Sequence, residues 1–247
     1  MPSHATVNQA PSGERALRGE GFSKSFFGRP EVLKSASVWA TQGRITGLFG
    51  RNGSGKTTLL RCMLGLTEAT CGVTHFLGEA TERPRLRRLA RRGLFYLPDR
   101  HLLPRSLRFG DMVKAVEWAH GPSPTRAAIF NRLGVEALER RWASQLSGGE
   151  QRRCEWALAL LSRPTCVVAD EPLAGVTPKD QLLVARVVRE LAAGGCAVVV
   201  TGHEVTELLE LVDEVVWMTA GTTHGLGSSA QARAHDQFRR EYLGPRT

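Results

Sequence analysis

The sequence contains no long apolar run. Its longest apolar stretches, near Ala157–Leu161 and Ala197–Val200, have the length of core segments and fall far short of the roughly 18 residues that a membrane-spanning helix needs. The N-terminal segment contains no apolar stretch either, so we expect no signal peptide. These absences predict a cytoplasmic protein, although such a protein can still dock on a membrane.

Cysteine is also scarce. The five cysteines are Cys62, Cys71, Cys154, Cys166 and Cys196. Their spacings match no metal-binding template, and an odd number cannot pair completely into disulfides. In a cytosolic chain we expect reduced thiols, most of them buried as small apolar side chains.

Aromatic residues make up only 6% of the chain, whereas Lys and Arg outnumber Asp and Glu by 33 to 24, a net charge of +9. Much of the excess lies in one basic run, Arg83–Arg92. Such a balance suits nucleic acid, anionic lipid headgroups or an acidic protein partner. Because aromatic residues do not interleave with the basic run as stacking platforms would, we favour solvated helix faces over a nucleic-acid surface.

The remaining composition, 42% hydrophobic and 23% charged over 247 residues, is typical of one globular domain or a domain with a subdomain. Residues 1–18 are rich in Pro, Ser, Gly and Ala, and we expect them to form a disordered tail. Downstream, short apolar strands alternate with helical segments, which predicts an α/β fold whose parallel sheet is covered on both faces.

The expected strands are Arg44–Phe49, Gly93–Leu97, Cys166–Ala169, Ala197–Thr201 and Glu214–Met218, and the expected helices are Lys56–Gly65, Gln151–Ser162, Leu182–Ala192 and Val205–Leu211. The segment His101–Gln145 differs because it lacks core strands and has the pattern of short helices. It predicts an inserted helical subdomain, and we expect it to move as a lever on the core.

The segment after the first of these strands fits the pattern G-x-x-x-x-G-K-[ST], with a strand before it and a helix after it, which is the context of a phosphate-binding loop. Glycines let backbone N–H groups approach a polyphosphate, and the helix N-terminus favours an anion. Lys56 is placed to reach the β- and γ-phosphates, and Thr57 to bind Mg²⁺. The residues expected to bind the nucleotide are Gly50, Asn52, Gly53, Ser54, Gly55, Lys56, Thr57 and Thr58.

Two carboxylates, Asp170 and Glu171, follow the apolar strand Cys166–Ala169. They are therefore expected at the carboxyl edge of the sheet, where the sites of α/β proteins lie. We expect Asp170 to hold Mg²⁺, directly or through water, and Glu171 to polarise the attacking water.

A third motif, Leu146–Gln151, places a serine and two glycines at the start of a helix. It suits a second anion-binding helix N-terminus. An ordinary capping box, with Ser147 as the cap and Glu150 three residues later, explains the same residues. Both interpretations can hold, and the open question is whether the cap faces solvent or the nucleotide of another chain.

Together, the segments GRNGSGKTT, LSGGEQRR and VVADEP closely resemble those of the ATP-binding cassette (ABC) ATPases, and the resemblance extends from about Gly21 to Gly244. It implies a P-loop NTPase core with a mostly parallel sheet, a small antiparallel β subdomain and an inserted α-helical subdomain. The implied core comprises residues 19–99 and 151–247. The implied helical subdomain, residues 100–150, ends in the signature loop.

In that family two cassettes enclose two ATP molecules with Mg²⁺, head to tail. The resemblance implies that the signature residues of this chain, Ser147, Gly148, Gly149 and Glu150, act on the ATP of a partner cassette. It implies a catalytic role for Glu171 and for His203, which matches the switch histidine that contacts the γ-phosphate. Phe27 lies about where an aromatic ring stacks on adenine, with Phe26 as a possible substitute.

The sequence departs from the family pattern at two positions. Asp99 replaces a glutamine that touches Mg²⁺ and the attacking water, so the implied metal ligands are Thr57, Asp170 and Asp99. Thr177 replaces an aspartate that links the two ATP sites. Both changes resemble the ATPases of one subtype of branched-chain amino-acid importer. The PLAGVTP segment and the ending FRREYLG resemble that group and the lipopolysaccharide-export ATPase.

The resemblance implies the ATPase subunit of an ABC transporter. Such a subunit forms a homodimer or heterodimer and lies on the cytoplasmic face of the inner membrane, where it binds a separate transmembrane permease. Candidate permease contacts, each of which could instead be core, are Phe95, Leu102, Leu103, Leu107 and Phe109. Two alternatives remain at this point. One is a soluble ABC ATPase acting on nucleic acid or ribosomes, although we expect no specific nucleic-acid partner. The other is a regulatory cassette with weakened hydrolysis, which the residues at 99 and 177 motivate.

Overall fold

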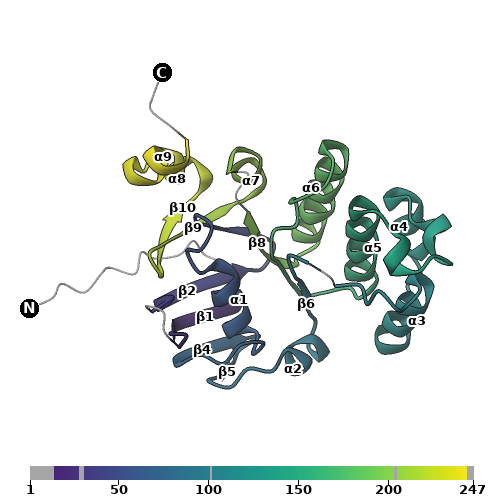
Figure 1. Cartoon of the computed structure of the whole chain (residues 1–247), viewed down its shortest axis with the longest axis horizontal. Coiled ribbons are helices and arrows are strands. Elements are labelled where there is room, and N and C mark those ends of the chain that lie inside the picture. Colours follow the sequence, from purple (N-terminus) through teal and green to yellow (C-terminus); the bar gives the residue numbers. More distant parts are fainter. Residues whose placement is uncertain (1–13, 28–30, 101, 203–204, 244–247) are drawn as a thin grey trace, which may run out of the picture.

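A computed structural model describes residues 14–27, 31–100, 102–202 and 205–243. Its centre is a six-stranded sheet with the order β10-β9-β3-β8-β7-β6 (Figure 1). Five strands run parallel, and β10 pairs antiparallel with β9. The strands are β3 (Ile45–Phe49), β6 (Leu94–Leu97), β7 (Cys166–Ala169), β8 (Ala197–Gly202), β9 (Glu214–Thr219) and β10 (Thr222–Gly227). The five expected strands are confirmed, with bounds shifted by at most one residue.

The apolar runs of the central strands have a simple physical reason. Neighbouring residues of β7 point to opposite faces of the sheet, and both faces are buried. Val167 belongs to a core cluster that includes the helices α5 and α6, whereas Val168 belongs to a second cluster that includes helix α1. These helices are α1 (Lys56–Met63), α5 (Gly148–Leu161) and α6 (Pro178–Ala193).

A second, antiparallel sheet has the order β2-β1-β4-β5. Its strands are β1 (Arg15–Lys24), β2 (Leu33–Thr41), β4 (Cys71–Phe76) and β5 (Glu79–Thr81). Because β1 begins at Arg15, the expected disordered tail is wrong for residues 15–18, and residues 1–13 lie outside the described part. Helix α1 packs between the two sheets, since its buried side chains share one cluster with β1, β2 and β3.

The segment between β6 and β7 is helical, as expected. It contains α3 (Phe109–His120), α4 (Arg126–Leu133) and short 3₁₀ turns at Glu136–Leu138 and Ala143–Gln145 before α5. The rings of Phe109 and Phe130 stack with centroids 5.7 Å apart and join α3 to α4. These helices lie beside the central sheet, on the right of Figure 1. The boundary expected at residue 150 falls inside α5.

The remaining helices are α2 (Leu86–Arg91), α7 (Val205–Leu211), α8 (Ser229–Ala234) and α9 (Asp236–Tyr242). Among the described residues, no helix has the length and apolar character needed to cross a bilayer. All five cysteines are free thiols, and only Cys71 is exposed, which confirms the expectation of mostly buried thiols.

Candidate active site

The phosphate-loop motif connects β3 to α1, as the sequence predicts. Its glycines are required by geometry. Gly55 has φ +110°, and a Cβ there would lie 2.8 Å from Met218 Cε. A Cβ on Gly50 would lie 2.4 Å from Ser54 Oγ. Helix α1 starts without a side-chain cap or an acidic residue in its first turn, so its N-terminal N–H groups remain suited to an anion.

Lys56 is buried and bends back over the loop. Its Nζ donates to the carbonyl oxygen of Gly50 at 2.6 Å and to that of Arg51 at 3.4 Å. Burial lowers the pKa of Lys56, while the carboxylates of Glu171 and Asp170 act in the opposite direction. The ammonium group is therefore held at the loop by weak backbone acceptors, which the oxygens of a triphosphate can replace.

Asp170 is completely buried at the end of β7. Its Oδ1 accepts a hydrogen bond of 2.5 Å from Thr201 Oγ1 on β8. Burial raises the pKa of Asp170, the hydroxyls of Thr201 and Thr57 lower it, and Asp99 and Glu171 raise it further. Its Oδ2 makes no hydrogen bond in the described part of the chain. A buried carboxylate oxygen without a partner, close to the Thr57 hydroxyl, fits a Mg²⁺ ligand.

Glu171 has φ +51°, in the left-handed region that is uncommon for residues other than glycine. Its N–H donates to Thr201 Oγ1 at 2.9 Å, and its carbonyl oxygen accepts from the N–H of Ala174 at 3.2 Å. One threonine hydroxyl thus connects both carboxylate-bearing residues. At Glu171 the backbone therefore leaves the direction of β7 in a strained turn. Such strain is typical of functional positions.

These elements surround one pocket of about 820 Å³. It is lined by Phe26, Val32, Asn52, Gly53, Gly55, Lys56, Thr57, Thr58, Asp99, Arg100, Glu171, Ala174 and Gly175. The structure therefore brings Glu171 and Asp99 to the phosphate loop, as expected. Gly50 and Ser54 belong to the same loop but do not line the pocket, and Asp170 lies buried beneath it.

The two phenylalanines differ in position. Phe26 lines the pocket and lies under the Lys24 ammonium, whose Nζ is 5.1 Å from the ring centroid. Phe27 is fully exposed and does not line the pocket. The ring beside the phosphate loop is thus Phe26, the residue that the sequence offered only as a substitute. His203 lies outside the described residues.

The signature residues lie outside this pocket. Ser147 caps α5: its Oγ accepts from the Glu150 N–H at 3.3 Å, and Glu150 Oε2 accepts from the Ser147 N–H at 2.8 Å. These contacts lower the pKa of Glu150. The expected capping box is confirmed. A hydroxyl that accepts one hydrogen bond still has its own proton to donate, so the cap leaves Ser147 able to bind a phosphate.

The start of α5 is also tied to the start of α6. Asp180 on α6 accepts from Arg153 Nη1 on α5 at 3.0 Å and from Thr177 Oγ1 at 2.9 Å. Thr177 caps α6 through a hydrogen bond from the Asp180 N–H. A Cβ on Gly149 would lie 2.6 Å from Asp180 Oδ2, so the first turn of α5 approaches this carboxylate closely. In this chain, Thr177 therefore orders the helix that supports the signature loop.

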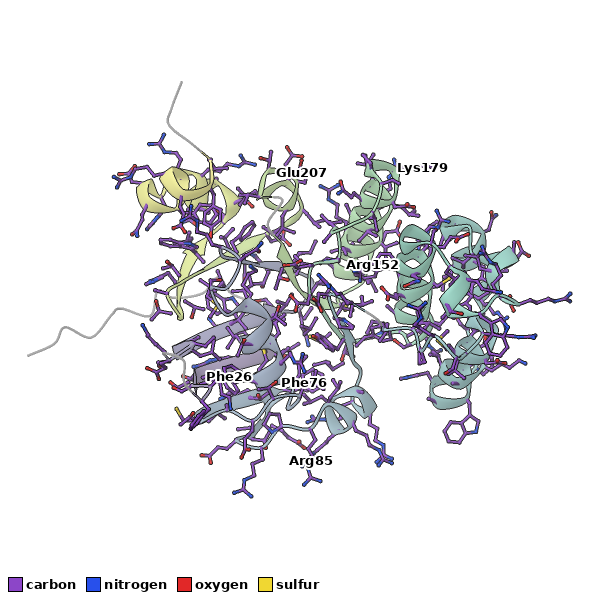
Figure 2. The ribbon with its side chains drawn as sticks, viewed as in Figure 1. Phe26, Phe76, Arg85, Arg152, Lys179 and Glu207 are labelled. Atoms are coloured by element: carbon purple, nitrogen blue, oxygen red, sulfur yellow. The ribbon has the colours of Figure 1, made fainter. Side chains whose placement is uncertain are left out.

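Sequence reasoning missed a buried ion pair on α5. Arg152 Nη1 and Glu155 Oε2 are 2.9 Å apart, and their side chains are only 8% and 5% exposed. Arg152 also donates to the carbonyl oxygens of Pro98 at 3.4 Å and Asp99 at 3.2 Å. Figure 2 shows Arg152 between α5 and the central sheet. We call this arrangement the Arg152 clamp: it joins the signature helix to the backbone of the Asp99 loop.

A family model described as "ABC transporter" matches residues 33–174 of the chain. This chain belongs to the ABC transporter ATP-binding family. It is 35% identical over 243 residues to a probable ABC transporter ATP-binding protein from Azorhizobium caulinodans, with 96% of this chain and 86% of the relative covered. It is 30% identical over 234 residues to the lipopolysaccharide export system ATP-binding protein LptB from Escherichia coli K12, with 92% and 97% covered.

Solved structures show the same fold. The ADP-bound ATP-binding cassette MJ1267 matches with a TM-score of 0.78 at 24% identity and covers 94% of this chain and 100% of its own. A dimeric post-hydrolysis cassette, MJ0796 with ADP and Pi, matches with a TM-score of 0.73 at 20% identity, covering 85% and 98%. The resemblance and the expected α/β fold are confirmed, and the chain is an ATP-binding ATPase subunit of an ABC transporter.

Proposed function

We propose that two cassettes, of which this chain is at least one, close head to tail around two Mg²⁺-ATP molecules and drive a separate transmembrane permease from the cytoplasmic face of a membrane. One observation carries the proposal. The phosphate loop and Glu171 line one pocket, whereas Ser147 lies outside it. A second cassette that brings its own Ser147 to this pocket would complete the site.

The residues have distinct roles in this proposal. Lys56 leaves the carbonyl oxygens of its loop and binds the β- and γ-phosphates. Thr57, Asp170 and, at the rim, Asp99 would hold Mg²⁺, which neutralises charge on the phosphates when bound. Glu171 orients the attacking water and accepts its proton. His203 would contact the γ-phosphate. Phe26, rather than Phe27, would stack on adenine, because only Phe26 lines the pocket.

Only some of the candidate permease contacts lie on the surface. Leu103 and Phe109 are buried in the core, so they cannot serve as contacts without unfolding. Phe95 and Leu102 are half-buried, and Leu107 is 42% exposed. We propose Leu107 and its surroundings, whose backbone pairs with Ala143 just before the signature motif, as the place where a permease helix docks.

Affinity capture from detergent-solubilised host membranes tests the permease proposal, with Leu107→Asp compared with Leu182→Asp. Leu182 lies on α6 and is 65% exposed, so it is a matched control. The proposal expects a polytopic membrane protein in stoichiometric amount with the unmodified chain and with Leu182→Asp, but not with Leu107→Asp. Capture of ribosomal proteins or nucleic acid without a permease would contradict it and favour the soluble alternative.

An ATPase assay separates an active cassette from a regulatory one. The proposal expects Mg²⁺-dependent hydrolysis by the chain and at least a hundredfold loss in Lys56→Ala, because a buried cation at the phosphates is removed. Unchanged rates in Lys56→Ala would contradict the assigned site. ATP binding without hydrolysis by the unmodified chain would favour a regulatory cassette.

A further inference from the structure

The basic run Arg83–Arg92 forms a groove that the ATPase site does not use. The groove has a volume of about 580 Å³, and among the described residues its walls carry six arginines but a single carboxylate, that of Glu79. It lies between β5 and α2, at the lower edge of the molecule in Figure 1. In Figure 2, Arg85 extends there below Phe76. We call this feature the arginine groove.

Most of the charge in the arginine groove is uncompensated. Glu79 forms ion pairs with Arg88 at 3.0 Å and with Arg92 at 2.7 Å. Within the described chain, no ion pair involves the other four arginines of the groove, which are Arg83, Arg85, Arg87 and Arg91. Like charges collected in one concave surface create a positive potential that an anion relieves.

The groove is built on a fixed backbone. Leu89 of α2 is buried in the core below it. Gly65, at the end of α1, adjoins the segment leading to α2 so closely that a Cβ there would lie 1.9 Å from the carbonyl oxygen of Pro84. Arg92 donates to the carbonyl oxygens of Phe76 and Leu77, both at 3.2 Å. The arginines therefore start from an ordered scaffold, which lowers the entropy cost of binding.

The chemistry of the groove favours phosphate groups. Guanidinium forks bind phosphate oxygens in pairs and are less strongly hydrated than ammonium groups. A base-stacking nucleic acid fits poorly. Phe76, the one aromatic residue that lines the groove in the part of the chain that the structure describes, is buried and offers no open ring.

An exposed apolar side chain beside the groove points to a membrane. Leu66 follows Gly65, which approaches Pro84 closely, and it is 41% exposed. Arginines beside an exposed leucine are a combination suited to the headgroup region of a bilayer.

We infer that the arginine groove binds the phosphate headgroups of anionic phospholipids and seats this face of the cassette against the bilayer. The inference deepens the proposed function and rests on it, because a permease would bring the chain to a membrane. The groove itself needs no permease to bind lipid, and it is separate from the ATP pocket. Lipid binding can therefore fail while the transporter assignment stands. A failure to capture a permease would likewise leave lipid binding by the groove open to its own test.

Flotation of the full chain with vesicles tests the inference. The vesicles contain phosphatidylcholine alone or with about one third phosphatidylglycerol. The test variant replaces Arg83, Arg85, Arg87 and Arg91 by Gln, and the control variant replaces Arg140, Arg186, Arg233 and Arg240 by Gln. The two variants lose the same charge, and all eight side chains are exposed. If the fourfold variant does not fold, the pair Arg83→Gln/Arg87→Gln replaces it.

The unmodified chain should bind vesicles that contain phosphatidylglycerol and should not bind vesicles of phosphatidylcholine alone. The groove variant should lose affinity by about a thousandfold, which is about 1 kcal/mol for each of four arginines, while the control loses far less. ATP binding should be equal in both. Equal losses in the two variants would overturn the inference, because net charge alone would then explain binding. So would groove-dependent binding of polyglutamate or single-stranded DNA without vesicle binding.

Discussion

The Arg152 clamp leads to a prediction with a defined size. Arg152→Met removes a cation whose partner, Glu155, is 5% exposed, together with two hydrogen bonds to the Asp99 loop. Breaking a buried ion pair by removing one partner costs about 3–5 kcal/mol. At roughly 2–4 °C per kcal/mol for a chain of this size, the midpoint of thermal unfolding should fall by about 10 °C.

The loss should depend on pH. Burial raises the pKa of Glu155, and Arg152 opposes that rise, so Arg152→Met should raise the pKa further. A carboxyl group whose folded pKa exceeds its unfolded value destabilises the fold as pH rises from the unfolded pKa through the folded one. The cost of Arg152→Met should therefore be smallest near the unfolded pKa of a glutamate, about pH 4–5, and should grow as pH rises above it.

Urea unfolding at several pH values measures this cost, with Arg140→Met as a control, because Arg140 is exposed and lies outside the clamp. The double variant Arg152→Met/Glu155→Met removes both charges and should recover much of the lost stability, because no uncompensated carboxylate remains. A cost below about 1 kcal/mol, or a cost of equal size at all pH values, would mean that Arg152 and Glu155 do not form a stabilising buried ion pair. If the clamp also positions the Asp99 loop for hydrolysis, Arg152→Lys should lower the hydrolysis rate more than the affinity for ATP, with both measured well below the unfolding temperature of the variant.

Three further predictions concern the pocket. Phe26→Ala should weaken ATP binding about tenfold or more, as expected for loss of one stacked base, whereas Phe27→Ala should change it less than about twofold in the same titration. Mg²⁺ affinity, measured by calorimetry with ATP, should rise with pH through the raised pKa of Asp170, since only the ionised carboxylate binds the metal; a flat profile would remove Asp170 from the ligands. Gly55→Ala should abolish ATP binding and cost at least about 1–3 kcal/mol, because its φ of +110° strains any residue with a Cβ, which would also lie 3.1 Å from the backbone carbonyl oxygen of Val32; normal ATP binding would contradict the described loop.

The predicted strands and helices were those whose signals are local. The strands of the central sheet are buried on both faces, so each appears as a continuous apolar run. Strand β1 gives no such signal. Its sequence, RALRGEGFSK, mixes charged residues and glycines, and its pairing shifts register between Gly19 and Phe22. Only the neighbouring strands β2 and β4 define it, which is why a disordered tail was expected to reach residue 18.

The candidate site likewise contains residues that local sequence reveals and contacts that only the folded chain reveals. The phosphate loop is contiguous, so its residues could be assigned from spacing alone. The contact between Asp170 and Thr201 joins residues 31 positions apart on neighbouring strands, and the Arg152 clamp joins a helix to a loop more than fifty positions away. Such contacts depend on tertiary structure. The choice between Phe26 and Phe27 has a related difficulty. Both follow the end of β1, Phe27 lies in a turn, and only Phe26 lines the pocket, so the geometry of the turn, rather than the spacing along the chain, decides which ring faces the phosphate loop.

The central claim is that Ser147 of one cassette acts on the ATP held by another. Light scattering with Mg²⁺-ATP on Glu171→Gln and on Glu171→Gln/Ser147→Arg, with ATP binding to the monomer measured in parallel, tests it most directly. The single variant should form an ATP-dependent dimer that holds two nucleotides. The double variant should stay monomeric and still bind ATP, because the signature lies outside the chain's own pocket. Loss of ATP binding to the monomer in the double variant, or a dimer that Ser147→Arg leaves intact, would show that Ser147 does not act on a partner's ATP.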